Sequence, residues 1–462
     1  MCLTADCAVV DLQLIAGRER SLRRPAQAPR CLWCAWINVV ANRYEHRPVG
    51  FLPMLLLLIV LGLIAGCSVP GGKASYGSTG SEPEEGIVKE SATNEPREST
   101  AKENARNEPE QSTSKKVGLL SLEDAVGQMF VVGVGGTEPD YYIKKTIRKR
   151  NIGGIILHDY NMQSKERTQA MVSELQKLSI KTSLCIPLIV AVDQEGGRVS
   201  SAPWVTYHPP AAVVGQSGDP AQAQRIAEEI GRQLDAAGVN TDLAPVVDTG
   251  FGAAIGDRSF GTDPHLVSEM GAAAVRGFEA AGIISTAKHF PNHGAAKVDS
   301  HTGLPVVDHD IQTVLSYDLP PFKQAVEAGV PMVMVGHLLY PAIDPERPAS
   351  LSPKAIKLLR QEVGFDGVII TDDLAMEGAK QGGTVAQAAV KAVSAGADML
   401  IISSPQEQVD AYAAVVRGVK QGRISQDQIN GSVDRILKLK QRYLLRNSFG
   451  QHLGSCGTKL RR

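Results

Sequence analysis

The segment Lys288–Gly294 (KHFPNHG), followed closely by Asp299-Ser300-His301, carries the densest set of residues that could do chemistry. A carboxylate beside an imidazole fixes the tautomer of the ring and raises its basicity, which suits general acid–base work near neutral pH. We therefore expect Asp299 and His301 to act as an acid–base pair. The alternative is an ordinary ion pair in a loop, since such pairs also perturb pKa values.

The same segment could instead hold a metal ion, with Asp299, His289, His293 and His301 as ligands. Pro291 disfavours the helix that would place His289 and His293 on one face. The spacing also matches none of the common zinc sites. We therefore expect no metal ion, and nothing in the sequence calls for another cofactor.

A second candidate segment is Gly367–Leu374 (GVIITDDL), in which a short apolar run ends in two carboxylates. Adjacent residues of a strand point to opposite faces, so we expect Asp372 and Asp373 to have different roles. A carboxylate that faces a general acid is the nucleophile of a retaining glycosidase. The alternative is that both residues cap the next helix, because Asp favours that position.

These segments belong to a repeating pattern in which short apolar runs alternate with amphipathic helical stretches, from about residue 117 to residue 445. The predicted strands are Met129–Val134, Gly153–His158, Pro187–Asp193, Asp242–Asp248, Ile283–His289, Met332–His337, Val368–Asp372 and Met399–Ser403. The predicted helices between them include Ala221–Ala237, Leu266–Ala281, Ser316–Ala328, Pro353–Glu362 and Thr384–Ala395. Nearly continuous apolar runs are expected where strands are buried on both faces.

Eight such strands predict an α/β fold, a single (β/α)8 TIM-type barrel. The alternative is an open doubly wound sheet, whose dinucleotide-binding form needs the spacing G-x-G-x-x-G. Gly133–Gly136 reads GVGG and does not meet that spacing. The barrel is therefore the favoured architecture.

Most of the predicted strands end in a polar residue, namely His158, Asp193, Asp248, His289, His337, Asp372 or Ser403. In a parallel barrel these strand ends meet at one rim, where the loops that follow the strands build the active site. We expect helix caps and turns to account for Asp248 and Ser403 without any chemistry.

Composition narrows the class of protein. The formal net charge is −1, with 48 Lys and Arg against 49 Asp and Glu, which argues against a nucleic-acid partner. Charged residues make up 21% of the chain, and 45 residues are Gly. This composition fits a globular enzyme and not a coiled coil or a collagen.

The N-terminal quarter of the chain is typical of targeting and not of folding. Met54–Ala65 (MLLLLIVLGLIA) has the length of a signal-peptide core and is shorter than the roughly 20 residues that span a bilayer. It runs into Ile64-Ala65-Gly66-Cys67, which resembles the bacterial lipobox. The resemblance implies cleavage before Cys67 and lipidation of its thiol. The alternative is an ordinary signal peptide or a buried helix that ends in a cysteine.

Residues 68–117 are rich in Gly, Ser, Glu, Lys and Thr, and contain too few apolar residues to offset the entropy of ordering. We expect a disordered tether there. After cleavage, Cys185 and Cys456 would be the remaining free thiols, so a disulfide framework is not expected. The expected organisation is 1–66, an over-extended start and lipoprotein signal peptide; 67–117, the lipidated Cys67 and linker; 118–447, the barrel; and 448–462, a flexible tail.

Four motifs, in this order, resemble those of family 3 glycoside hydrolases, in the β-N-acetylglucosaminidase branch. They are DQEGGRV (Asp193–Val199), IGDRSFG (Ile255–Gly261), KHFPNHG with Asp299–His301, and TDDL (Thr371–Leu374). The resemblance covers about Ser121 to Leu445. The Asp-Ser-His triplet separates this branch from the β-glucosidases of the same family.

The resemblance implies a retaining exo-β-N-acetylglucosaminidase. Asp372 would be the nucleophile that forms a covalent glycosyl-enzyme, His301 the proton donor and later the base, and Asp299 the group that polarises His301. The residues that would bind the sugar are Asp193, Arg258, Lys288 and His289. A histidine is neutral once it has lost its proton, so it adds no second negative charge beside the Asp372 ester.

The chain departs from the family pattern at two positions. Asn292 stands where the branch often has Gly, and Asn tolerates a positive φ better than most residues. Ser201 stands where the family often places an Arg, and Arg198 is not an assured replacement. One contact to the sugar is therefore in doubt.

We expect the protein to act on terminal β-linked N-acetylglucosamine of peptidoglycan fragments or related glycans. We expect a monomer on the extracytoplasmic side of the cell membrane, held by the lipid on Cys67. Three alternatives stay open: assistance by the substrate's acetamido group, with Asp372 or Asp373 only orienting it; phosphate as the acceptor; and a sugar-binding lipoprotein without turnover.

Overall fold

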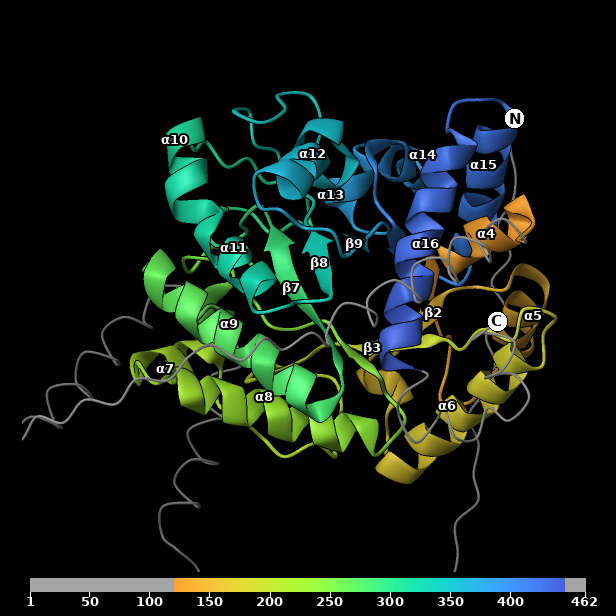
Figure 1. Ribbon diagram of the computed structural model, residues 1–462, viewed down its shortest axis with the longest axis horizontal. Coiled ribbons are helices and arrows are strands. Elements are labelled where there is room, and N and C mark those ends of the chain that lie inside the picture. Colours follow the sequence, from red (N-terminus) through yellow and green to blue (C-terminus); the bar gives the residue numbers. More distant parts are fainter. Residues whose placement is uncertain (1–119, 445–462) are drawn as a thin grey trace, which may run out of the picture. The chain divides into compact units, whose positions relative to one another are not determined.

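The computed structural model describes residues 120–444. Within this range, eight parallel strands close into a barrel in the order β1-β10-β9-β8-β7-β6-β3-β2 (Figure 1). The strands are β1 (Phe130–Gly133), β2 (Gly154–Ile156), β3 (Ile189–Val192), β6 (Thr241–Asp242), β7 (Ile284–Phe290), β8 (Met332–Val335), β9 (Val368–Asp373) and β10 (Met399–Ile402). The prediction of a TIM-type barrel is confirmed. The assignments for residues 1–66, 67–117 and 448–462, Cys67 included, lie outside the described residues.

Helices surround the strands. They are α4 (Leu122–Gln128), α5 (Tyr141–Arg150), α6 (Lys165–Ile180), α7 (Ala211–Gln216), α8 (Pro220–Asp235), α9 (Pro264–Ala281), α10 (Ile311–Thr313), α11 (Pro320–Glu327), α12 (Pro353–Gln361), α13 (Glu377–Lys380), α14 (Val385–Ala395), α15 (Gln408–Lys420) and α16 (Gln426–Tyr443). Strands β1, β3, β8 and β10 are buried at every position, because side chains inside the barrel cover one face and helices cover the other.

Local chemistry explains where the long helices start and stop. Asp219 and Asp263 each accept a backbone N–H of the first turn, of α8 and α9 respectively, and each is followed by a proline. Helix α9 ends at Gly282, whose φ of 75° is the left-handed conformation that glycine adopts most easily. The predicted helix Ser316–Ala328 differs: a π-helical turn precedes α11, which restarts at Pro320.

Strand β6 is shorter than the predicted Asp242–Asp248. Regular pairing stops at Asp242, and further along only Val246 forms a single bridge, to Lys288. Pro245 has no N–H to donate, so the regular ladder is interrupted there, although its carbonyl still accepts the Lys288 N–H at 3.2 Å. The rest of the predicted strand is an irregular segment that leads into the rim.

A small antiparallel hairpin, which the sequence did not predict, follows β3. It pairs β4 (Gln194–Gly196) with β5 (Val199–Ser200). Gly197 at its turn has a φ of 57°, and a Cβ there would lie 2.6 Å from the Cβ of Pro210. Glycine is therefore required where the hairpin folds against the segment before α7.

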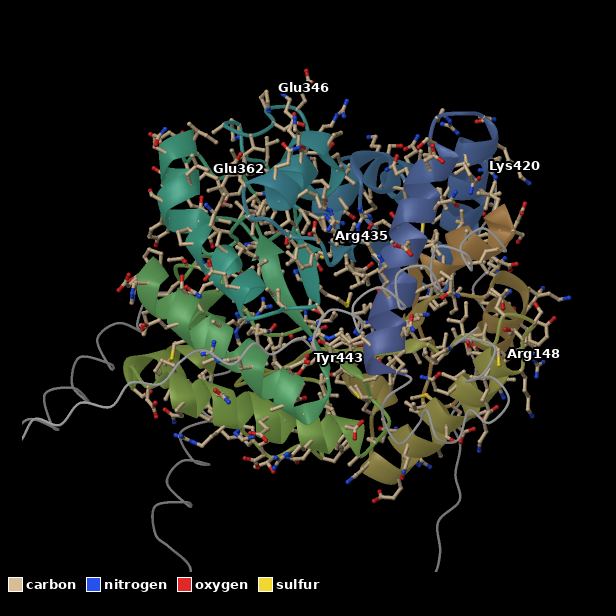
Figure 2. The ribbon with its side chains drawn as sticks, in the orientation of Figure 1. Arg148, Glu346, Glu362, Lys420, Arg435 and Tyr443 are labelled. Atoms are coloured by element: carbon tan, nitrogen blue, oxygen red, sulfur yellow. The ribbon has the colours of Figure 1, made fainter. Side chains whose placement is uncertain are left out.

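The C-terminal helix α16 closes the helical ring against α4 (Figure 1). Arg435 of α16 (Figure 2) reaches the buried Asp398, at 3.0 Å, and Arg360 of α12 approaches the same carboxylate at 2.6 Å.

Among the described helices, none is long and apolar enough to cross a membrane. Cys185 is disulfide-bonded, which corrects the expectation of a free thiol there.

Candidate active site

A cavity of about 390 Å³ lies at the carboxyl ends of the strands. The polar residues that line it are His158, Asp193, Arg198, Ser201, Arg258, Lys288, His289, Asp299, His301, Asp372 and Asp373. Every residue predicted to do catalysis or bind the sugar is among them, although they come from segments far apart in the chain. Apolar side chains such as Met334 and Ile401 form the rest of the lining.

Asp372 stands at the end of β9 and accepts the backbone N–H of Asp373 at 2.8 Å. Burial by itself raises the pKa of this carboxyl, but the nearby His337 and His289, with that N–H, outweigh burial and lower the pKa to about 2. Asp372 is therefore an ionised carboxylate at any physiological pH. It is free to act as a nucleophile because no proton has to leave first.

Asp373 has different surroundings, as expected for adjacent residues of a strand. Its carboxylate accepts the backbone N–H groups of Ala375, at 3.0 Å, and Ser403, at 3.2 Å, and the Ser403 hydroxyl donates to it. Ser403 follows β10, so this network joins the ends of β9 and β10. Asp373 thus fixes the rim beside Asp372.

Asp299 and His301 form the expected pair. Oδ1 of Asp299 lies 2.7 Å from Nδ1 of the His301 ring and accepts the His301 backbone N–H at 2.9 Å. Burial opposes ionisation of Asp299, but these contacts lower its pKa. Because Nδ1 is held by the carboxylate, the other ring nitrogen is left to exchange a proton at the cavity. The side chains are 69% and 41% exposed for His301 and Asp299, so the pair stands at the mouth.

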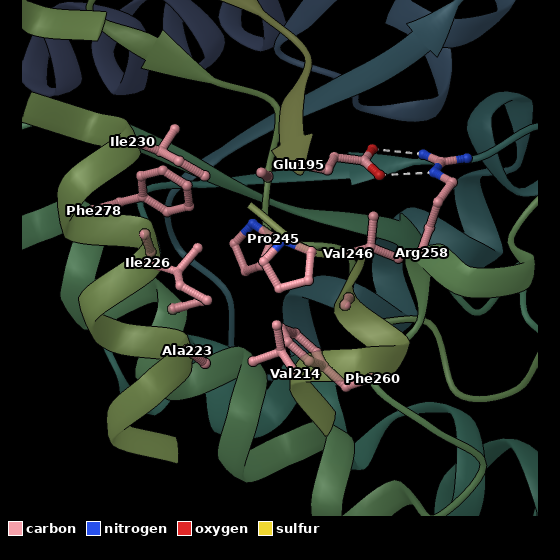
Figure 3. A pocket seen from close by; sticks show the side chains of 15 residues that line it. Glu195, Val214, Ala223, Ile226, Ile230, Pro245, Val246, Arg258, Phe260 and Phe278 are labelled. Atoms are coloured by element: carbon pink, nitrogen blue, oxygen red, sulfur yellow. Dashed lines mark hydrogen bonds and ion pairs between the residues drawn. The ribbon is translucent and has the colours of Figure 1, made fainter. Parts of the chain in front are cut away.

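Two cations meet two carboxylates deeper in the cavity. Nζ of Lys288 lies 2.6 Å from Asp193 and 2.8 Å from Glu195. Arg258 makes two parallel bonds to Glu195, at 2.8 Å and 2.7 Å (Figure 3). Burial alone would raise the pKa of Glu195, but Lys288 and Arg258 lower it to about 2. The cluster therefore stays ionised and presents charged groups to hydroxyls of a sugar.

Glu195 is a residue that the sequence reasoning missed, although it lies inside the DQEGGRV motif. It reaches Arg258 from 63 positions away in the chain. Behind the pair lies a small apolar cavity of about 40 Å³, lined by Val246, Phe260 and Phe278 among others (Figure 3). The Glu195 side chain is only 6% exposed, so its charge depends on Lys288 and Arg258 for compensation.

Asp248 was expected to be an ordinary cap or turn residue, but it holds the His289 ring instead. Its buried carboxylate lies 2.7 Å from Nδ1 of His289 and also accepts the backbone N–H groups of His289, at 3.2 Å, and His293, at 2.5 Å. Burial opposes ionisation, but His289 lowers the pKa of Asp248. Asp248 thus orients the His289 ring towards the sugar cavity. The Lys288–His289 peptide bond is cis.

Asn292 was expected to stand in a loop that needs a positive φ, but its φ is not positive. Its side chain has a different role, in hydrogen bonding. Its Oδ1 accepts the N–H groups of Thr249, at 3.0 Å, and Gly294, at 2.8 Å. Its Nδ2 donates to the Thr249 carbonyl at 3.0 Å and to Asp318 at 2.8 Å. One amide side chain therefore joins the loops after β6 and β7.

Metal binding finds no support in the geometry of residues 120–444. In that range, no group of three or more His, Cys, Asp and Glu side chains is placed to hold a metal ion. His289 and His293, which the metal hypothesis would use, are instead held by Asp248 and by Ser300, whose hydroxyl lies 2.9 Å from Nε2 of His293.

Known proteins resemble this chain in sequence and in fold. A Paenibacillus sp. str. FPU-7 structure, of a glycoside hydrolase family 3 beta-N-acetylglucosaminidase, is 36% identical, covers 74% of this chain and 68% of its own, and has a TM-score of 0.69. "Beta-hexosaminidase" of Methylobacillus flagellatus is 35% identical over 62% of this chain and 82% of its own length. "Beta-hexosaminidase A" of Pseudoalteromonas piscicida is 34% identical over 64% of this chain, and the match spans about half of that protein, 54%.

The family model described as the glycosyl hydrolase family 3 N terminal domain matches residues 121–439. That span is nearly the whole of the described barrel and includes every residue assigned to the cavity. The chain belongs to glycosyl hydrolase family 3, a family of glycoside hydrolases.

Proposed function

We propose that the protein is a retaining exo-β-N-acetylglucosaminidase that works through a covalent glycosyl-enzyme. The observation that carries the proposal is that Asp372, ionised and half-buried, shares one sugar-sized cavity with the Asp299–His301 pair. A nucleophile and a proton donor that face the same small volume are what a retaining glycosidase needs. The names of the related proteins point to a hexosaminide as the substrate.

In the first step, Asp372 attacks the anomeric carbon and the bond to the glycosidic oxygen breaks. The protonated His301 ring gives its proton to that oxygen, so the aglycone leaves as an alcohol. Asp299 holds Nδ1 of the ring, at 2.7 Å from its Oδ1, so the proton that is transferred comes from the other ring nitrogen. The ring is neutral afterwards, so the Asp372 ester has no second anion beside it.

In the second step, the neutral His301 ring removes a proton from a water molecule, which attacks the anomeric carbon. The carbon–oxygen bond to Asp372 breaks, the sugar leaves with its configuration retained, and His301 is protonated again. Throughout both steps Asp193, Arg258, Lys288 and His289 bind the hydroxyl and acetamido groups of the sugar. Charged hydrogen bonds of this kind are about twice as strong as neutral ones.

Peptidoglycan fragments are the proposed natural substrate, and the proposed location is the extracytoplasmic face of the cell membrane, with Cys67 as the lipid anchor. The support for the location is the lipobox-like sequence at Ile64–Cys67. We propose a monomer with no nucleic-acid partner. Comparison of activity on muropeptides and on chitobiose, with protein from Ser68 onward, tests the substrate. Faster release from chitobiose would favour a chitin-type substrate instead.

The catalytic assignment is tested with the p-nitrophenyl β-N-acetylglucosaminide. We expect Asp372→Ala and His301→Ala to lose at least about 1,000-fold in kcat/KM, which is the scale of removing a nucleophile or a general acid–base group. His265→Ala, on the exposed surface of α9, is the matched control and should keep full activity. Wild-type rates in either cavity variant would reject the assignment.

A fluorinated sugar substrate followed by peptide mass mapping separates the covalent route from assistance by the acetamido group. The covalent route predicts a stable label on Asp372. If turnover occurs and no residue is labelled, Asp372 only orients the substrate. If the sugar binds in calorimetry and no product forms, the protein is a sugar-binding lipoprotein.

A further inference from the structure

The ring of His158 and the hydroxyl of Ser201 line the sugar cavity. The His158 side chain takes part in a capping box with Asn161, within its own turn, and no hydrogen bond joins it to another described residue of the cavity. Two charged residues of the same cavity are engaged with other side chains: Asp193 with Lys288, and Arg258 with Glu195. A polar side chain that is half-buried in a cavity and bonded to no other residue of its lining is placed to receive a ligand, because leaving it unpaired there costs free energy. His158 has no role in the mechanism above.

The position of His158 is fixed by the protein and does not depend on a ligand. Its backbone N–H donates to Asn161 at 2.8 Å, and the Asn161 amide donates to the carbonyl of Val134 at 3.0 Å. Its ring stacks on Tyr160, with the centroids 5.6 Å apart and the planes at 27°. Tyr160 is itself held by a bond to the Val134 carbonyl at 3.2 Å. Such preorganisation lowers the entropy lost on binding.

Arg198 does not supply the contact that Ser201 is too short to make. Its guanidinium donates to Asp257 at 2.9 Å and to the carbonyls of Ala254 and Ile255, each at 3.0 Å. These bonds tie Arg198 to the loop after β6. Arg198 therefore does not replace the missing arginine, and the contact must come from another polar residue of the lining, among which His158 has no other role.

We propose that His158 is a further sugar-binding and specificity-determining residue, which hydrogen-bonds one hydroxyl of the bound sugar from the end of β2. Strand β2 pairs with β3, so His158 enters the cavity beside Asp193, and the two residues approach the same edge of the sugar. A neutral imidazole both donates and accepts, which matches a hydroxyl. This inference deepens the proposed function and rests on it.

His158→Phe tests the proposal because it keeps a planar ring for the stack on Tyr160 and removes the ring nitrogens. We expect KM to rise about threefold to tenfold, the effect of one lost neutral hydrogen bond, with kcat within about twofold. His265→Phe, exposed on α9, is the matched control. Ser201→Arg in the His158→Phe background should recover part of the loss.

Monodeoxy sugar substrates separate a direct contact from a structural effect. With the substrate that lacks the hydroxyl bound by His158, His158→Phe should cause no further rise in KM. With the other deoxy substrates, the rise in KM from the mutation and the rise from the missing hydroxyl should multiply. An unchanged KM in His158→Phe, or equal losses with every deoxy substrate, would overturn the proposal.

Calorimetric titration with N-acetylglucosamine keeps the two proposals apart. If the wild type binds this sugar without turning over glycosides, the proposed activity fails, and weaker binding by His158→Phe still supports the sugar contact. If the wild type turns over glycosides and His158→Phe binds the sugar with full affinity, the proposed activity stands and only the proposed His158 contact is rejected. If the wild type neither binds nor turns over, both fail.

Discussion

Glu195 is one side chain on which several others depend. It neutralises both Arg258 and Lys288 in a region where burial would otherwise disfavour every charge. Glu195 and Arg258 border the small apolar cavity, and Lys288 is buried. The orientation of Arg258 and Lys288, the proposed sugar-binding cations, is therefore set by Glu195.

We expect Glu195→Gln to lower kcat/KM by at least about 100-fold, because removing one partner of a buried ion pair costs roughly 3–5 kcal/mol. Glu195→Asp keeps the charge and should lose less. Steady-state kinetics with the p-nitrophenyl substrate, beside melting temperatures, measure both effects. Glu174→Gln, which breaks an exposed pair of 2.7 Å with Lys144, is the control and should change little. Equal kinetics for Glu195→Gln and the control would contradict this role.

The site residues that sequence could predict are those whose partner is close in the chain or whose type is rare at a strand end. Asp299 and His301 are two positions apart, so their pairing is local. Asp248 reaches His289 from 41 positions away. From the sequence alone, an Asp at the end of an apolar run is equally consistent with a helix cap. Only the closed barrel shows that Asp248 lies against the His289 ring.

At the scale of elements, the loops after β6 and β7 act as one unit. Asp248 and Asn292 each form a hydrogen bond from one loop to the other.

The apolar runs in the sequence were enough to predict eight strands, because strands that are buried on both faces must be apolar along their length. They did not predict the early end of β6, since only the partner strand shows that Pro245 interrupts the ladder, nor the β4–β5 hairpin, whose short polar strands carry no apolar signal.

We expect Asn292→Gly to destabilise the fold by about 1–3 kcal/mol, because the Thr249 N–H and the Asp318 carboxylate lose a buried partner. The melting temperature should fall and kcat/KM should fall with it, since His293 and Asp248 lie on the loosened loops. Asn292→Ala removes the same bonds without the backbone freedom of glycine, so the difference between the two variants measures that freedom. A glycine variant as stable as the wild type would refute the role of the amide.

At the scale of the whole molecule, α4 and α16, the first and last helices within residues 120–444, lock the barrel. Nζ of the buried Lys440 in α16 donates to Oε1 of Gln128 in α4 at 2.8 Å. Burial lowers the pKa of Lys440 from 10.5 to about 7. The unfolded chain therefore binds one more proton than the folded chain between about pH 7 and pH 10.5.

This difference predicts that the Lys440 contribution to stability increases as pH rises from about 7 to 10, since stability rises wherever the unfolded state binds more protons. Below pH 7 the folded state must bury the charge, and the contribution is at its least favourable. Lys440→Met should flatten this part of the profile. Chemical unfolding at a series of pH values measures the slope. The exposed Lys438→Met is a control on the same helix, and an equal slope in wild type and Lys440→Met would exclude the titration of Lys440.

The pairing of β1 with β10 carries a further consequence. Phe130 faces Leu400 across this seam, so the barrel closes between strands that are 270 positions apart. Until the last strand of the barrel, β10, has left the ribosome, β1 has an open edge on that side. The barrel of a nascent chain therefore cannot close, and its early strands stay open to non-native pairing, until β10 has emerged.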